Sequence, residues 1–234
     1  MQACAAAPFA AAQARSCDAR WRPHDLLFLQ RLPAFDDEPA WVRDAFARAP
    51  YAVVRRALAA DGYVAIGVRG VERAQRYGTW AQADDIVSAV PPEALAQARP
   101  LAARAALAPF VALANLAASQ HDATAPLNGF IWGPTGSAGF ELATQTPALT
   151  RSSDLDLLIR TPEPLAQALA CELLDQLQTV AQHVGIRVDA QLETPAGGVA
   201  LAEWAARKAR VMARHARGPQ LVADPWAHLE CGER

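Results

Sequence analysis

Ser153-Asp154-Leu155-Asp156-Leu157-Leu158-Ile159 is the most informative stretch of this 234-residue chain. Side chains alternate between the two faces of a strand, so Asp154 and Asp156 point one way while Leu155, Leu157 and Ile159 point toward the core. Two carboxylates about 7 Å apart along a strand can converge on a hard cation, and without a cation they would repel each other. Taken alone, the pattern is more typical of a turn aspartate followed by one exposed aspartate.

A glycine-rich loop precedes this strand, with the sequence Gly133-Pro134-Thr135-Gly136-Ser137-Ala138-Gly139. Glycine lets the backbone approach a phosphate, and backbone N–H groups together with the Ser137 hydroxyl can hold phosphate oxygens beside a helix that follows. Gly136 and Ser137 are therefore candidate substrate-binding residues, although Gly-Ser by itself is also typical of a flexible loop. Sixteen residues separate Ser137 from Asp154.

Residues 186–193 alternate apolar and polar side chains and predict a second strand. If this strand lies beside the first, its polar face brings a third carboxylate to the pair Asp154 and Asp156. Asp189 is the candidate for that role, with Glu193 as the alternative. A solvated strand face would give the same pattern.

The elements around these two strands indicate the fold class. Residues 155–160 predict a strand, residues 164–183 a helix, and residues 201–217 a basic amphipathic helix that carries Arg207, Lys208 and Arg210. The order loop, strand, helix, strand, helix predicts an α/β or α+β core.

The N-terminal part reads as a separate small α+β domain over residues 21–90, ended by Pro91-Pro92, with the catalytic domain over residues 91–234. Its predicted strands are residues 51–56 and 63–70. Arg69, Arg73 and Arg76 cluster here, and on a helix Arg73 and Arg76 would share a face. Residues 1–20 are alanine-rich and are expected to be a disordered tail.

Composition excludes several classes of protein. A net charge of −2 argues against a broad nucleic-acid interface, and no segment is long and apolar enough to span a membrane. Hydrophobic residues make up 52% of the chain, enough for a substantial core. The four cysteines show neither metal-ligand spacing nor a compact disulfide framework, so a reduced, cytoplasmic location is expected.

The Gly-Ser loop followed by Asp-x-Asp on a strand resembles the DNA-polymerase-β-like nucleotidyltransferase superfamily. More narrowly, the chain is similar to the holo-acyl-carrier-protein synthases of malonate decarboxylase, the phosphoribosyl-dephospho-coenzyme A transferases. The resemblance runs from about Trp21 to Trp226. Its main stretches are Arg22-Pro23-His24-Asp25-Leu26-Leu27, Gly67-Val68-Arg69-Gly70, the loop from Gly133 to Thr144, Ser153-Asp154-Leu155-Asp156-Leu157, Arg187-Val188-Asp189 and Asp224-Pro225-Trp226.

The resemblance implies a small N-terminal domain followed by a polymerase-β-like nucleotidyltransferase domain with a mixed sheet. It implies transfer of the phosphoribosyl-dephospho-CoA group from 2'-(5''-triphosphoribosyl)-3'-dephospho-CoA to a serine of the apo acyl carrier protein of malonate decarboxylase, with release of pyrophosphate. Its catalytic and Mg²⁺-binding residues, for two ions, would be Asp154, Asp156 and Asp189. Its substrate-binding residues would be Gly136, Ser137, Arg69, Arg73, Arg76 and Lys208.

Two other functions fit the same residues. The first is a generic Mg²⁺-dependent nucleotidyltransferase that acts on another acceptor, which a comparison of ATP with the triphosphoribosyl donor would detect. The second is a catalytically silent binding module of the same fold. Such a module would normally have lost one carboxylate, whereas all three aspartates are present.

Overall fold

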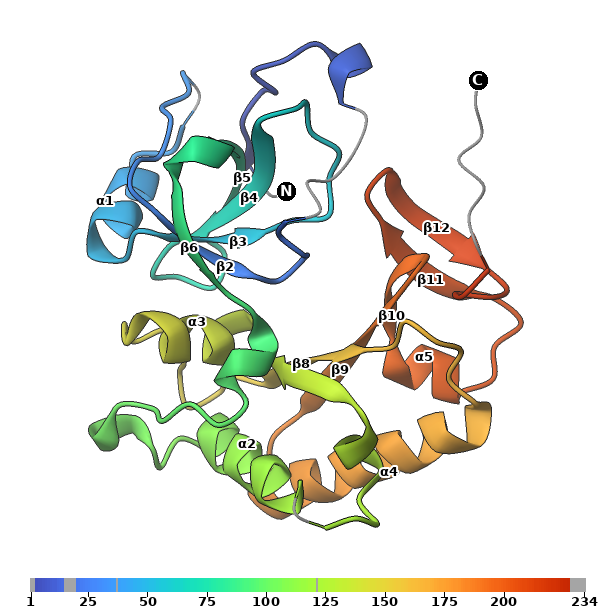
Figure 1. Cartoon of the computed structure of the whole chain (residues 1–234). Helices are drawn as coiled ribbons and strands as arrows, with labels where there is room; N and C mark the ends of the chain where they lie inside the picture. Colours follow the sequence, from blue (N-terminus) through green and yellow to red (C-terminus); the bar gives the residue numbers. More distant parts are fainter. Residues whose placement is uncertain (1–2, 15–19, 37, 121, 228–234) are drawn as a thin grey trace. The chain divides into compact units, whose positions relative to one another are not determined.

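The computed structural model describes residues 3–14, 20–36, 38–120 and 122–227 (Figure 1). The chain divides into two compact units, residues 1–91 and 92–234, with the boundary between Pro91 and Pro92. Each unit has a six-stranded sheet of its own with helices packed on it. The predicted α+β class is confirmed. Among the described residues, no helix combines the length and the apolar character that a bilayer span requires.

The first unit is built on a sheet with the strand order β1-β5-β4-β3-β2-β6. The strands are β1 (Ala3–Cys4), β2 (Leu26–Leu29), β3 (Tyr51–Val54), β4 (Tyr63–Arg69), β5 (Arg76–Gln82) and β6 (Ile86–Val90). Helix α1 (Trp41–Arg48) buries Val42 and Ala45 in the same core as Leu27, Ile66 and Tyr77. Short 3-10 helices span Ala11–Gln13 (η1) and Ala83–Asp85 (η2).

The expected disordered tail is wrong for residues 3–14. Strand β1 pairs in parallel with β5, and the Ala5 amide donates a hydrogen bond of 2.8 Å to the Gly78 carbonyl. The Phe9 ring lies 5.4 Å from the Tyr63 ring, centroid to centroid. Backbone pairing at a sheet edge and aromatic contact therefore hold this segment to the sheet. Residues 1–2 and 15–19 of the predicted tail lie outside the described residues.

The second unit has the strand order β12-β11-β10-β9-β8-β7. The strands are β7 (Ile131–Pro134), β8 (Leu155–Arg160), β9 (Val188–Thr194), β10 (Gly197–Ala200), β11 (Val211–His215) and β12 (Gly218–Val222). The helices are α2 (Ala108–Ser119), α3 (Gly136–Thr144), α4 (Gln167–Val184) and α5 (Leu201–Ala205), with 3-10 turns at Pro92–Leu95 (η3), Ala102–Arg104 (η4) and Pro126–Gly129 (η5).

Strands β8 and β9 run parallel, and the other neighbouring strands of this sheet are antiparallel, so the predicted mixed sheet is confirmed. Two parallel neighbours need a crossover, which α4 provides. Helix α4 ends at Gly185, whose φ of 77° is the left-handed conformation that glycine adopts readily. Its buried residues Ala170, Leu173 and Leu177 form the apolar face of the helix.

The predicted basic helix over residues 201–217 is wrong. Helix α5 ends at Ala205, and β11 and β12 follow it as an antiparallel hairpin. Arg207 has a φ of 53°, outside the range of a continuing helix. Val211 and Ala213 are buried while Met212 and Arg214 are exposed, which is the period of a strand. Pairing with β12 and β10 therefore overrides the helical tendency of the alanine-rich sequence.

Candidate active site

The two carboxylate-bearing strands lie side by side in register. In the parallel pair β8 and β9, Asp156 is directly opposite Asp189, and Leu155 is opposite Val188. Neighbouring strands are about 4.8 Å apart, so Asp156 and Asp189 stand close together on one face of the sheet. Asp154 precedes β8 by one residue and shares the face of Asp156. The apolar residues of β8, Leu155, Leu157 and Ile159, are buried, at most 1% exposed.

The glycine-rich loop meets these carboxylates at the start of helix α3. The Thr135 amide donates a hydrogen bond of 2.8 Å to the Asp156 carbonyl. Gly136 has a φ of 58°, and a Cβ atom placed on it would lie 2.1 Å from Asp156 Oδ2. Only glycine satisfies both demands, so Gly136 permits the Asp156 carboxylate to lie against the helix start. Although sixteen residues lie between Ser137 and Asp154 in the sequence, the Gly-Ser segment and Asp156 are therefore adjacent in the fold.

Ser137 lies in the first turn of α3 and is half-buried. The first amides of a helix have no partner within the helix, and its positive dipole end favours anions. The amides of Gly136 and Ser137 thus provide hydrogen-bond donors suited to an anion next to Asp156. The structure places these two residues in a helix start, where the sequence predicted a loop.

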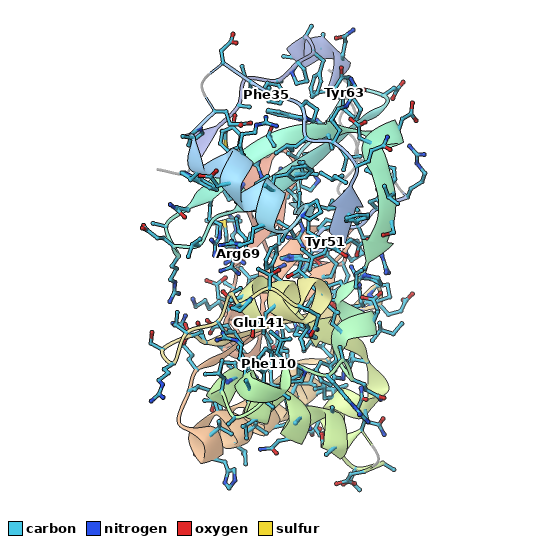
Figure 2. All side chains as sticks on the ribbon, turned by 90° about the vertical axis from the view of Figure 1, so that its left-hand side faces the viewer. Phe35, Tyr51, Tyr63, Arg69, Phe110 and Glu141 are labelled. Carbon is cyan, nitrogen blue, oxygen red and sulfur yellow. The ribbon has the colours of Figure 1, made fainter. Side chains whose placement is uncertain are left out.

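A buried glutamate holds the interval between Ser137 and Asp154 in place. Glu141 is 1% exposed, and Figure 2 shows it among the packed side chains of the second unit. Its Oε2 accepts hydrogen bonds from the amides of Ala148 and Leu149, at 2.7 and 2.9 Å, and from Arg104 Nη2 at 3.0 Å. Arg104 also donates to the Leu149 carbonyl at 2.7 Å. Helix α3, η4 and the segment leading into β8 are therefore tied to one carboxylate.

Burial disfavours the charged form of Glu141, but the hydrogen bonds from Arg104, Leu149 and Ala148 outweigh it and hold the pKa of this carboxyl below its ordinary value of 4.5. The hydrogen bond to Glu141 likewise raises the pKa of Arg104. The pair is thus ionised at neutral pH. Sequence reasoning missed it, because nothing in the order of residues shows that positions 104 and 141 meet.

Arg187 is a further residue whose place in the site was not predicted from the sequence. Its Nη2 atom lies 3.2 Å from Asp154 Oδ2 and 2.7 Å from Asp189 Oδ2. Arg187 stands two residues before Asp189, so both side chains project to the same side of the chain. This two-residue spacing is the sequence feature that could have assigned Arg187 to the site. One guanidinium therefore contacts two of the three predicted metal ligands and offsets part of their negative charge.

The site suits a divalent cation by its chemistry. Three carboxylates on one sheet face provide the oxygen ligands that Mg²⁺ prefers, and a positive group already lies between two of them. As the side chains stand in the described part of the chain, no three acidic, histidine or cysteine groups are gathered closely enough to hold a metal ion. A bound cation would therefore require the aspartates to turn toward one another.

Two other candidate residues, Glu193 and Lys208, lie elsewhere in the second unit. Glu193 is four residues beyond Asp189, about 13 Å along the strand, and is opposite Arg160 in the register. The structure therefore brings Asp189, not Glu193, beside Asp156. Lys208 lies in the loop between α5 and β11, with its Nζ atom 3.6 Å from Glu203 Oε1 and its side chain 55% exposed.

Arg69, Arg73 and Arg76 belong to one hairpin of the first unit, so Arg73 and Arg76 do not share a helix face. Arg69 ends β4 and Arg76 begins β5, where the two are directly paired across the strands. Arg73 is exposed in the connecting turn. Figure 2 labels Arg69 in the first unit. Antiparallel pairing thus places Arg69 and Arg76 on one face of the sheet.

Comparison with known proteins covers both units. The family described as phosphoribosyl-dephospho-CoA transferase MdcG C-terminal domain matches residues 95–225, and the corresponding N-terminal domain family matches residues 22–92. A phosphoribosyl-dephospho-CoA transferase of Pseudomonas putida (strain W619) is 46% identical over 90% of this chain and 97% of its own length.

Other organisms carry similar proteins of the same name. The transferase of Pseudomonas aeruginosa is 45% identical over 89% of this chain and 95% of its own length. That of Klebsiella pneumoniae is 40% identical over 89% of this chain and 98% of its own length. No solved structure shows significant similarity to the chain.

Proposed function

The chain belongs to the phosphoribosyl-dephospho-CoA transferase family and is a transferase. From this membership we propose the specific donor and acceptor of the reaction. The donor is 2'-(5''-triphosphoribosyl)-3'-dephospho-CoA, and the acceptor is a serine of the apo acyl carrier protein of malonate decarboxylase. The observation that carries the proposal is the pairing of Asp156 with Asp189 directly beside the start of α3. An anion-binding helix start next to paired carboxylates suits a polyphosphate donor.

In the proposed reaction the serine Oγ attacks the α-phosphorus of the donor triphosphate. The bond between that phosphorus and the oxygen bridging to the β-phosphate breaks, and pyrophosphate leaves. Asp189 accepts the serine proton in this proposal, and the amides of Gly136 and Ser137 hold the outer phosphates. Asp154, Asp156 and Asp189 would hold Mg²⁺, which when bound neutralises phosphate charge and lowers the pKa of the acceptor hydroxyl.

Mass spectrometry of the carrier protein tests this proposal. After incubation of the apo carrier with enzyme, donor and Mg²⁺, we expect the carrier to gain the mass of one phosphoribosyl-dephospho-CoA group, and a carrier with its acceptor serine changed to alanine to gain none. A parallel incubation with ATP serves as the test for a generic nucleotidyltransferase. Modification from ATP alone, or no modification from the donor, would refute the proposed reaction.

Removing the Ser137 hydroxyl should weaken donor binding and slow turnover without abolishing it. In Ser137→Ala the amides of the helix start remain, and one hydrogen bond to a charged group is worth about 1.5–3 kcal/mol. This corresponds to a loss of roughly tenfold to a hundredfold in kcat/KM, measured by pyrophosphate release. Complete loss of activity with an intact fold would point to a nucleophilic role, which trapping of a covalent Ser137 adduct would show directly.

Replacing Arg69, Arg73 and Arg76 together by glutamine should weaken binding of the donor or of the carrier protein. Three guanidinium groups in one hairpin match either donor phosphates or an acidic protein surface. Donor affinity and carrier affinity are measured separately over a salt series. A donor-specific loss that persists at high salt assigns the hairpin to donor binding, whereas a carrier-specific loss that shrinks with salt assigns it to docking, because salt screens exposed charges.

The control for this triple variant is Arg48→Gln, which removes an exposed positive charge at the end of α1 in the same unit. Circular dichroism establishes that both variants fold. If the triple variant binds donor and carrier as tightly as the control does, the three arginines have no part in recognition.

A further inference from the structure

Arg187 contacts two of the carboxylates that would hold the proposed cation. In the register of β8 and β9, Leu155 is opposite Val188, so the preceding residues Asp154 and Arg187 are neighbours across the pair. The guanidinium contacts the carboxylates of both Asp154 and Asp189 through the same Nη2 atom. A divalent cation bound to these oxygens would carry the same sign of charge as Arg187 and would compete with it directly.

The Arg187 side chain has room to leave this position. It is 65% exposed, and it borders an open hollow of about 660 Å³ that is also lined by Arg151, Ser152, Gln178 and Gln182. A long, exposed side chain exchanges rotamers rapidly, so its release requires no rearrangement of β9. The two ion pairs are exposed, and each is accordingly weak enough to be exchanged.

We propose that Arg187 is an exchangeable counter-cation, which holds Asp154 and Asp189 in the metal-free enzyme and turns to the donor phosphates when the divalent cation binds. This rests on the proposed function of the three aspartates. Part of the negative charge of Asp154 and Asp189 is offset before the substrate arrives, and a bare cation binds only weakly because it must displace the guanidinium. A cation that arrives with a polyphosphate binds more strongly, since the displaced Arg187 gains phosphate oxygens as new partners.

Binding of Mn²⁺, followed by electron paramagnetic resonance without any turnover, tests this exchange. For Arg187→Ala we expect the affinity for Mn²⁺ alone to rise about tenfold, because two competing ion pairs are gone. The same variant should bind the preformed complex of Mn²⁺ with inorganic triphosphate several-fold more weakly, because it has lost a phosphate partner. Arg187→Lys, which keeps the charge, should stay closer to the unmodified protein in both measurements.

Arg151→Ala is the matched control, because Arg151 lines the same hollow and, among the described residues, forms no ion pair with Asp154 or Asp189. If Arg187→Ala changes the Mn²⁺ affinity no more than Arg151→Ala does, or lowers it, the exchange is refuted. Asp156→Asn separates this failure from failure of the metal site itself. If Asp156→Asn binds Mn²⁺ as tightly as the unmodified protein does, the proposed metal site is refuted. If Asp156→Asn loses Mn²⁺ binding while Arg187→Ala keeps the affinity of the unmodified protein, the exchange alone is refuted.

Discussion

Asp156→Asn should lower turnover by roughly 10³-fold, since stabilisation of transition-state charge by a bound metal is worth several kcal/mol. Asparagine has the same shape, so it still fits against Gly136 at the start of α3, where the side chain of residue 156 lies. The substitution removes only the negative charge that the proposed Mg²⁺ requires. Asp154→Asn should act in the same direction. Pyrophosphate release measures the effect.

The control for this prediction is Asp175→Asn, which removes an exposed carboxylate from α4. It should retain normal turnover. Circular dichroism and a thermal melt should superimpose for the wild type and all three variants. Near-normal turnover of Asp156→Asn or Asp154→Asn would remove the metal-site assignment, whatever the fold of the variants.

The second large effect is on stability. Glu141→Gln should lower the free energy of unfolding by about 3 kcal/mol at neutral pH, because removing one partner of a buried ion pair leaves the other uncompensated. The glutamine amide also presents a donor where the amides of Ala148 and Leu149 need an acceptor. For a chain of this size the midpoint of thermal unfolding should fall by roughly 10 °C. Calorimetry measures both quantities.

The stability that Glu141 contributes should fall as the pH becomes acidic. The pKa of Glu141 is lower in the folded protein than its ordinary value of 4.5. Its contribution to stability is therefore fully present above about pH 4.5 and is lost as the pH falls through the folded pKa. Wild-type stability should decline over this acidic range more steeply than that of Glu141→Gln. The exposed Glu172→Gln on α4 is the control, and equal stability of the two variants at neutral pH would contradict this role of Glu141.

The acidic strand was predictable because its signal is local. The alternation over residues 155–160 has the period of a strand, and β8 has the same bounds in the structure. The same argument placed Asp154 and Asp156 on one face. The alternating apolar residues Leu155, Leu157 and Ile159 are buried, as the pattern requires. The fold class and the family resemblance followed from several such local signals in a fixed order.

The C-terminal hairpin shows where local signals fail. Residues 201–217 are rich in alanine and arginine, which favour a helix in isolation. In the structure β11 pairs with β10 and β12, and the hydrogen bonds and burial gained there outweigh the helical tendency. Arg69 and Arg76 give a second case, because the pairing of β4 with β5 places them opposite each other. Neither pairing is visible in the residues of one segment.

The sequence by itself determined the strand of aspartates, the Gly-Ser motif and the family, because each depends on residues that are near one another along the chain. Only the tertiary structure decided that Asp189 and not Glu193 stands beside Asp156, that Gly136 lies against the Asp156 carboxylate, and that Arg187 bridges Asp154 and Asp189. These contacts are set by the register between β8 and β9 and by the path of the chain between α3 and β8. Register is fixed by the packing of the whole sheet, where a shift of one residue would turn each side chain to the opposite face.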